Sequence, residues 1–433
     1  MPSALAERQQ EPHGIGGLPP LLLWLIMLGV VVRVVLAFAL GDEATPISGA
    51  ADQYTYDALA QRVIAGHGFS FATGWYPFTH ANEPTAHWSY LYTLYLAAVY
   101  ALVGHHPLAA RVIQAMLSGL NCWLTYRLGR QLFDLWVGLA AAALTSAYAY
   151  FVFFNAALMT QTFYIMALLA ALSLALDLSQ RSDRRRWILL GLTLGLGVLL
   201  RQTVLLFTPI LIAWIIWMQR PRWTDVVLSA AIVVALVLPW TLRNYYAFGD
   251  FLLLNSNGGY WFYSSNHPNQ GVEFNPSYAA PLPGDLDGLP EPAVDRALYR
   301  RAAGFIVGDP LRFLRLTMSR LPHYFWLLPS AQSPTASNLG RVLSFPLYLP
   351  FMAYGLYLSR STWRRCLPMY LYVGFDTTLH LISWAAPRYR LPSDAVLMVF
   401  AGLALRTLVA RRWAVPANSA PSPTSVGQYR ARS

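Results

Sequence analysis

Arginines at the ends of long apolar runs are the first residues of this sequence that could do chemistry. Four of them stand out: Arg201 in GVLLRQTV, Arg243 in PWTLRNYY, and Arg388 and Arg390 in APRYRLP. An arginine inside a membrane costs about 2.5–3.5 kcal/mol on insertion scales and therefore needs a partner. Because the guanidinium fork matches phosphate oxygens bidentately, we expect the four to bind an anionic lipid headgroup or a diphosphate. Pairing of each arginine with a carboxylate is the alternative.

The carboxylates that could work with these arginines are few and lie mostly in one polar segment. Asp52 opens the stretch DQYTYDALAQRVI, whose pattern predicts a helix, and Tyr56 follows it in a DxxxY motif. A carboxylate at a membrane cavity could act as general base and take a proton from an acceptor hydroxyl. The competing interpretation is structural, because Asp is a preferred helix N-cap. The same segment also contains Asp42, Glu43, Asp57 and Glu83.

Histidines in the polar segments raise the question of a metal ion. Glu83, His87 and His267 carry the carboxylate and imidazole groups that bind divalent ions. Solvated loop residues of these types are the commoner case, so we expect no metal and no other cofactor. Together with Tyr56 and Tyr389, these three residues are candidates for the lining of a substrate cavity.

Composition indicates the class of protein that must position these residues. Of 433 residues, 56% are hydrophobic and 12% are charged, whereas soluble domains have about 25% charged residues. The charged residues form short clusters between long apolar runs, which is typical of a polytopic membrane protein. The net charge of +11 comes from arginine alone. Because the basic clusters flank the apolar runs, we expect membrane lipids as partners and exclude nucleic acid.

The apolar runs predict an all-α fold of about ten transmembrane helices. The runs lie near residues 18–40, 88–104, 107–126, 136–155, 158–177, 187–200, 203–218, 225–242, 342–358, 366–385 and 391–410. The positive-inside rule assigns the arginine clusters between them, and both termini, to the cytoplasm. This count requires that 88–104, which is short and rich in Tyr, lies at the outer interface. Two long outer loops with interfacial helices follow, at about residues 41–106 and 243–340.

One membrane domain accounts for nearly the whole chain. We assign residues 1–17 to a cytoplasmic N-terminal segment and 18–412 to the transmembrane domain. Residues 413–433, rich in Ser, Pro and Ala, are expected to be a disordered cytoplasmic tail. The polar start lacks a cleavage site, so 18–40 is interpreted as an uncleaved first span. We therefore predict a multi-pass protein of the inner or plasma membrane.

The order of several motifs points to a known family. The stretches are RVVLAFAL, ADQYTYDALAQRVIAGHGFSF, NEPTAHW, ARVIQAMLSGLNCWLTYRLGRQLFD, GLTLGLGVLLRQ, LPWTLRNYYAFGDFLLLNSNGGYWFYSSNHP and APRYRLP, within about residues 20–410. In this order they resemble the GT-C superfamily of integral membrane glycosyltransferases. The closest resemblance is to the bacterial branch related to protein O-mannosyltransferases and the lipid A aminoarabinose transferase.

The resemblance places the family's catalytic acid of the first outer loop at Asp52, and the sequence departs from the family pattern at two points. The family often has an Asp-Glu pair, whereas Asp52 is followed by Gln53, so the pair Asp42-Glu43 competes for the role. An acidic residue is also common at the outer end between the third and fourth spans, where this chain has Gln161. The second departure favours chemistry without a metal.

The resemblance implies an inverting glycosyltransferase. Such an enzyme moves a sugar from a polyprenyl-phosphate donor to a hydroxyl of a glycan, lipid or protein acceptor, on the non-cytoplasmic face. Asp52 would deprotonate the acceptor, and Arg201, Arg243, Arg388 and Arg390 would hold the donor phosphate. The alternative is a lipid-linked sugar flippase or transporter, which predicts charged residues distributed through the spans. The interior spans are nearly free of charge, which favours the enzyme; a structural partner of another membrane enzyme is a third interpretation.

Overall fold

The computed structural model describes residues 19–47, 49–75, 77–329 and 333–413. Within these ranges every regular element is a helix, and the extended pairing is limited to two isolated bridges, Ser70 with Pro84 and Trp75 with Thr79. The expected all-α fold is therefore confirmed. The predicted N-terminal segment 1–17 and all but the first residue of the predicted tail 413–433 lie outside the described residues.

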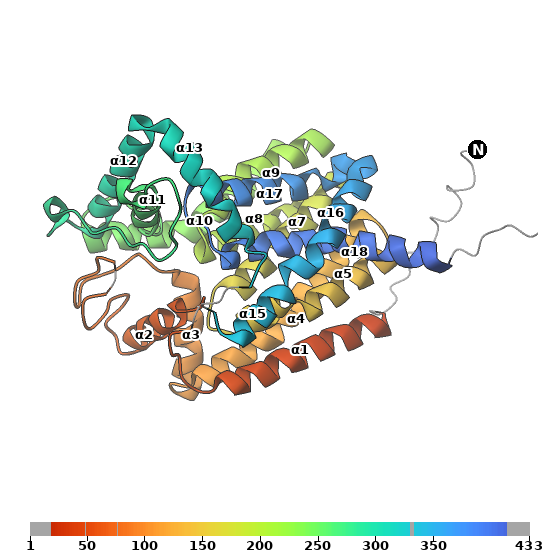
Figure 1. The fold of residues 1–433 in the computed structure, drawn as a ribbon, viewed down its shortest axis with the longest axis horizontal. Coiled ribbons are helices and arrows are strands. Elements are labelled where there is room, and N and C mark those ends of the chain that lie inside the picture. Colours follow the sequence, from red (N-terminus) through yellow and green to blue (C-terminus); the bar gives the residue numbers. More distant parts are fainter. Residues whose placement is uncertain (1–18, 48, 76, 330–332, 414–433) are drawn as a thin grey trace, which may run out of the picture.

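Long helices packed side by side form a bundle that makes up most of the molecule (Figure 1). Its members are α1 (Pro20–Leu40), α4 (Pro107–Leu132), α5 (Leu135–Ala147), α6 (Ala149–Ala156), α7 (Gln161–Gln180), α8 (Arg184–Leu200), α9 (Val204–Gln219), α10 (Trp223–Phe248), α16 (Phe345–Leu358), α17 (Trp363–Ile382) and α18 (Leu391–Trp413). Glycine allows the closest approach between two of them, since a Cβ at Gly355 of α16 would lie 1.8 Å from the carbonyl oxygen of Phe400 on α18. Small residues at such contacts are common where membrane helices pack.

Five helical stretches of the described residues are long and apolar enough to cross a membrane, or six if the bent pair α5 and α6 counts as one span. One of the five, Thr335–Ile382, has 48 residues. At about 1.5 Å per residue, a straight helix of that length would be more than twice as long as the hydrocarbon core, about 30 Å, is thick. The turn η3 (Ser359–Thr362) divides it into α16 and α17, so it contains both of the spans expected there. The total of about ten crossings stays a prediction.

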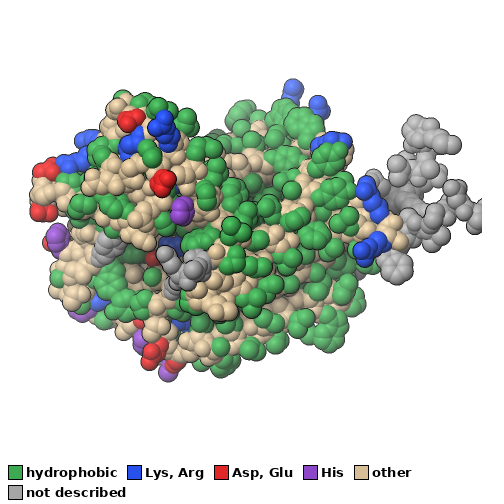
Figure 2. Space-filling view, in the orientation of Figure 1, with side chains coloured by type: hydrophobic (Ala, Val, Ile, Leu, Met, Phe, Trp, Pro, Cys, Tyr) green, Lys and Arg blue, Asp and Glu red, His purple; other side chains and the backbone are tan. Residues whose placement is uncertain are grey.

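Charged side chains gather at the two ends of the bundle, with an apolar belt between them (Figure 2). In this view one end carries Asp, Glu and His together with Arg, whereas the charged side chains at the other end are Arg (Figure 2). The positive-inside rule expects an excess of arginine at the end of the bundle that faces the cytoplasm. The orientation of the termini stays a prediction.

The two expected outer loops fold into helices that cover the acidic end of the bundle (Figure 1). The first contains α2 (Asp52–Ile64), the helix expected to start at Asp52, and α3 (Tyr90–Val103), which lies across the end of the bundle rather than along it. The second contains α11 (Gly258–Asn266), η1 (Pro268–Gln270), η2 (Gly284–Leu286), α12 (Glu291–Gly308), α13 (Pro310–Ser319), α14 (Leu321–Phe325) and α15 (Thr335–Val342). Because α10 continues to Phe248, this second segment starts later than the expected residue 243.

A buried carboxylate ties the two outer segments together. Oε1 of Glu291, the first residue of α12, accepts hydrogen bonds from the backbone nitrogen of Ala86 at 2.9 Å and from Oγ1 of Thr85 at 3.2 Å. The hydroxyl of Ser256 donates to the same oxygen. Burial raises the pKa of the Glu291 carboxyl above its usual value. This cluster fixes the segment that leads into α3 against the segment that leads into α11.

Candidate active site

A cavity of about 440 Å³ lies where the outer helices meet the ends of the bundle helices. Asp52 and Tyr56 reach it from α2, and Arg201 reaches it from the turn between α8 and α9. Arg388 and Tyr389 reach it from η4 (Pro387–Arg390), the turn between α17 and α18. The structure therefore brings together one carboxylate and two arginines that the sequence singled out.

Asp52 and Arg388 form an ion pair in this cavity. Oδ2 of Asp52 lies 2.8 Å from Nη1 of Arg388, and the Asp52 side chain is 27% exposed. Asp52 is the first residue of α2, and the N-cap position is Ala51. The helix-cap interpretation of Asp52 is therefore wrong. The carboxylate instead faces the cavity, with an arginine to hold its orientation.

Arg388 and Arg201 both lie against the ring of Tyr389. Nη2 of Arg388 donates to the Tyr389 hydroxyl at 3.0 Å, and the guanidinium carbon lies 5.0 Å from the ring centroid. The guanidinium carbon of Arg201 lies 5.9 Å from the same centroid and 5.3 Å from that of Tyr164. Nε of Arg201 donates to Oγ1 of Thr160 at 3.3 Å. Among the described residues, the terminal nitrogens of Arg201 make no hydrogen bond and no ion pair, which leaves them free for an anion. The charge of Arg201 interacts with the carboxylate of Asp376 without forming an ion pair with it.

Arg243 does not line this cavity, contrary to the expectation that all four arginines meet. Its terminal nitrogens donate to the backbone carbonyls of Thr85 at 3.0 Å and Phe69 at 3.3 Å. The guanidinium also stacks on the rings of Phe69 and Tyr90. Arg243 therefore holds the first outer segment against the end of α10.

Arg390 is also directed away from the cavity, although it is only two residues from Arg388. Its Nε lies 2.9 Å from Oδ1 of Asp394, one turn further along α18, and both side chains are almost fully buried. Nη1 donates to the carbonyls of Tyr324 at 2.6 Å and Phe325 at 2.8 Å. Since carboxylate and carbonyls use these donors, Arg390 acts as a structural clamp between α14 and α18.

The remaining candidates are distributed over different surroundings. Tyr56, His87 and Tyr389 line the cavity, whereas Glu83 is exposed and outside its lining. His87 is 2% exposed, and burial lowers its pKa to about 3, so its imidazole is neutral at physiological pH. Its Nδ1 has no hydrogen-bond partner among the described residues. His267 contacts the Tyr278 hydroxyl at 3.0 Å in the second outer segment.

The described residues contain no group of three or more His, Cys, Asp or Glu side chains placed to share a metal ion. Glu83, His87 and His267 therefore do not form such a group. Chemistry without a metal stays a prediction.

Several cavity residues were not singled out as site residues from the sequence. Asp376 and His380 of α17 line the cavity. Their spacing of four residues on an apolar helix is the signal that could have found them. The amide side chains of Gln202, Asn255 and Asn257 also line it, and nothing in their local sequence distinguishes them from other loop residues.

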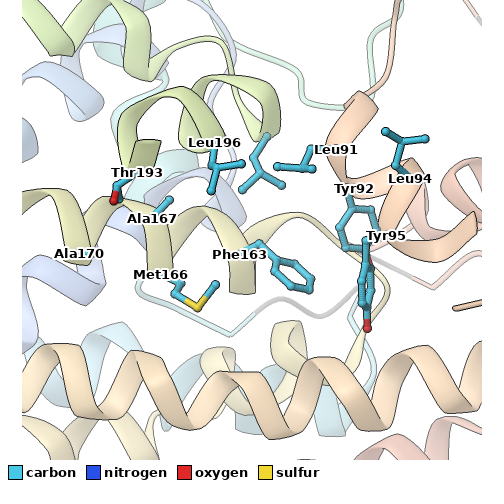
Figure 3. Close-up of a pocket in the computed structure, with 11 residues that line it drawn as sticks. Leu91, Tyr92, Leu94, Tyr95, Phe163, Met166, Ala167, Ala170, Thr193 and Leu196 are labelled. Carbon is cyan, nitrogen blue, oxygen red and sulfur yellow. The ribbon is translucent and has the colours of Figure 1, made fainter. Parts of the chain in front are cut away.

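An apolar groove of about 570 Å³ adjoins the polar cavity. It lies between α3, α7 and α8, and Figure 3 shows side chains such as Leu91, Tyr95, Phe163 and Met166 around it. Leu200, the last residue of α8, lines both the groove and the cavity. Since Arg201 is the next residue, the apolar groove ends beside the arginine that is free for an anion.

Comparison with known proteins finds similarity to a family of mannosyltransferases and to an arabinosyl transferase. A family model described as dolichyl-phosphate-mannose-protein mannosyltransferase matches residues 88–242. The undecaprenyl phosphate-alpha-4-amino-4-deoxy-L-arabinose arabinosyl transferase 1 of Pseudomonas fluorescens is 30% identical over 168 residues, covering 35% of this chain and 28% of that protein.

Two solved structures share the fold. The archaeal oligosaccharyltransferase AglB from Archaeoglobus fulgidus, solved with an inhibitory peptide and a dolichol-phosphate, has a TM-score of 0.55 and 16% identity, covering 90% of this chain and 50% of that chain. ArnT from Cupriavidus metallidurans in the apo state has a TM-score of 0.51 and 14% identity, covering 90% of this chain and 60% of that chain. At such identities the likeness shows the fold alone.

The fold defines the class: this is an integral membrane protein with the GT-C fold of membrane glycosyltransferases. Over the matched 168 residues the chain is similar in sequence to an aminoarabinose transferase, as the resemblance implied. The matched part spans 28% of the curated relative, and the chain covers 50% and 60% of the two solved chains.

Proposed function

We propose that this protein is an inverting glycosyltransferase that uses a polyprenyl-phosphate sugar and works on the non-cytoplasmic face of the inner or plasma membrane. The observation that carries the proposal is the position of Arg201. Among the described residues it is a cation without an ion pair, it lies in the cavity that contains Asp52 and Arg388, and it directly follows Leu200, which lines both the groove and the cavity. A donor with a phosphate between a sugar and a long apolar tail has matching chemistry in the same order.

In the proposed reaction the two arginines hold the donor phosphate. Arg201 offers its terminal nitrogens, and Arg388 offers the positive charge that now faces Asp52. The tail lies in the groove lined by α3, α7 and α8. As the bond between the anomeric carbon and the phosphate oxygen breaks, negative charge builds up on the phosphate, and the guanidinium groups stabilise it.

Asp52 acts on the acceptor. Its carboxylate takes the proton of the acceptor hydroxyl, the hydroxyl oxygen bonds to the anomeric carbon from the face opposite the phosphate, and polyprenyl phosphate leaves. A positioned base contributes about 100- to 10,000-fold to such a step. The ion pair with Arg388 keeps the carboxylate at the cavity while the site is empty of acceptor. The acceptor is a hydroxyl of a glycan, lipid or protein.

Purified protein in lipid vesicles tests this proposal. Sugar should be transferred from polyprenyl-phosphate donors to added acceptors, with release of polyprenyl phosphate. Movement of the intact donor between leaflets without turnover would instead support a flippase and refute the enzyme.

Arginine variants test the phosphate site directly. Arg388→Ala or Arg201→Ala should weaken donor binding about 10- to 100-fold, since one charge-assisted bidentate contact is worth about 1.5–3 kcal/mol. Arg388→Lys should restore part of the affinity, because an ammonium keeps the charge but not the fork. Arg300→Ala is the matched control, because Arg300 is an exposed arginine on α12 of the second outer segment. Equal donor affinity in wild type and in folded Arg388→Ala protein would refute the phosphate role.

A further inference from the structure

Asp376 and His380 form a polar pair on the wall of the cavity contributed by α17. Both residues line the cavity, and Asp376 is 4% exposed. They are one helical turn apart, with Nε2 of His380 3.7 Å from Oδ1 of Asp376. Neither has a part in the reaction described above. A carboxylate in such a buried position needs hydrogen-bond donors, because an unpaired charge is costly away from water.

The two oxygens of Asp376 differ in how well they are satisfied. Oδ2 accepts from the hydroxyl of Ser393 at 2.6 Å and lies 3.5 Å from that of Tyr324. Oδ1 accepts no hydrogen bond among the described residues, and Nε2 of His380 lies 3.7 Å from it, which is longer than a hydrogen bond. Oδ1 of Asp376 and Nε2 of His380 therefore face each other without a hydrogen bond between them.

Packing fixes the imidazole in this position. The His380 ring is stacked on the Tyr389 ring, with centroids 4.8 Å apart and planes 6° from parallel. The Tyr324 ring lies 6.4 Å away at 22°. Stacking on Tyr389 restricts tilting of the imidazole out of the stacked plane.

Tyr389 connects this pair to the arginines. The same ring that stacks on His380 lies next to the guanidinium groups of Arg388 and Arg201. A donor whose phosphate lies against the arginines therefore has Asp376 and His380 one ring away. In the proposed donor, the group one ring's width from the phosphate is the sugar.

We propose that Asp376 and His380 bind a hydroxyl group of the transferred sugar and so help to select the donor. His380 also has a hydrogen bond with the backbone of Trp384. The proposed contact uses the tautomer with hydrogen on Nε2, the nitrogen that faces the carboxylate. A hydroxyl placed between them donates to Oδ1 of Asp376 and accepts from Nε2 of His380. An ammonium group has no lone pair to accept the second bond, so a hydroxyl fits the pair better. This inference rests on the proposed glycosyltransferase function and adds a recognition site for the sugar.

Donors that each lack one sugar hydroxyl test the inference. A site built to hydrogen-bond a hydroxyl rejects the analogue without it strongly, by about 100-fold or more in kcat/KM. Wild type should show such a loss for one deoxy donor. His380→Phe, which keeps the stacking on Tyr389, and Asp376→Asn, which keeps an acceptor for Ser393, should turn over the parent and that deoxy donor at similar rates. If both donors slow down equally in folded variants, the pair has a structural role and the inference is wrong.

A binding measurement separates failure of this inference from failure of the proposed function. Polyprenyl phosphate without a sugar should bind wild type and His380→Phe equally, whereas the sugar-bearing donor should bind the variant at least about 10-fold more weakly. Equal affinity of wild type and His380→Phe for the sugar-bearing donor overturns the inference, whether or not turnover is seen. Absence of turnover by wild type with every donor counts against the enzyme itself. If Asp376→Asn does not fold, His380→Phe alone decides.

Discussion

Replacing Asp295 by Asn should make the outer helices less sensitive to rising pH. Asp295 lies on α12, is almost fully buried, and accepts a hydrogen bond from the backbone nitrogen of Gly259 at 2.7 Å. Burial raises the pKa of its carboxyl from 3.8 to about 7, and the neighbouring Glu291 adds to the rise. This carboxyl therefore prefers to be protonated in the folded protein.

The sign and size of the effect follow from this shift. A carboxyl with a raised pKa favours the folded state fully below its unfolded pKa, and that contribution is lost as pH rises to its folded pKa. A rise from 3.8 to about 7 corresponds to a loss of up to about 4 kcal/mol, at about 1.4 kcal/mol per unit, and about 2 kcal/mol of it falls between pH 5 and pH 7. Asparagine cannot ionise and still offers an oxygen to Gly259.

Thermal unfolding in detergent at pH 5 and pH 8 measures this difference. Wild type should lose more stability than Asp295→Asn between the two values, with the remaining pH dependence due in part to Glu291, whose pKa is also raised. Asp287→Asn is the control, because Asp287 is an exposed carboxyl of the same outer segment. Parallel pH dependence in wild type and Asp295→Asn would show that ionisation of Asp295 does not destabilise the fold.

Further expectations concern packing, clamps and topology. Gly259→Ala should lower the melting temperature, since its Cβ would lie 2.2 Å from a carbonyl oxygen of α12, whereas Gly304→Ala, with open space around it, should not. Asp57→Asn should also destabilise the protein, because its carboxylate accepts from the hydroxyl of Tyr100 at 2.6 Å; wild-type stability would contradict this. Arg390→Ala should reduce folded yield, as breaking a buried ion pair costs about 3–5 kcal/mol, rather than weaken donor binding selectively. A reporter inserted near Gly284 should respond as external, and a cytoplasmic response would undo the assignment of the cavity to the outer face.

Local pattern was enough to predict some of the site. The helix that begins at Asp52 and the turn that carries Arg201 both follow from where polar residues interrupt apolar runs. The pairing of Arg390 with Asp394 could also have been read from their spacing of four residues on one helix. The partners of Arg243 could not, because they are backbone carbonyls of the distant first outer segment. Every residue has a backbone carbonyl, so the sequence does not indicate which carbonyls Arg243 binds.

The cavity itself depends on tertiary packing. Asp376 and His380 have a recognisable spacing, but their access to the cavity depends on how α17 packs beside η4 and α14. A buried carboxylate inside a span is equally compatible with a purely structural pair. The aromatic neighbours of His380, Tyr324 and Tyr389, also come from other elements.

Turnover by Asp52→Asn is the direct test of Asp52 as the general base of the proposed sugar transfer. Asparagine keeps the size of the side chain, cannot take a proton, and leaves Arg388 free for phosphate, so the folded variant should bind donor at least as well as wild type. Glu43→Gln is the matched control, since Glu43 is an exposed acid of the same outer segment. Turnover should fall about 100- to 10,000-fold in Asp52→Asn and stay near wild type in Glu43→Gln. Near-normal turnover by Asp52→Asn would contradict the assignment of Asp52 as the base.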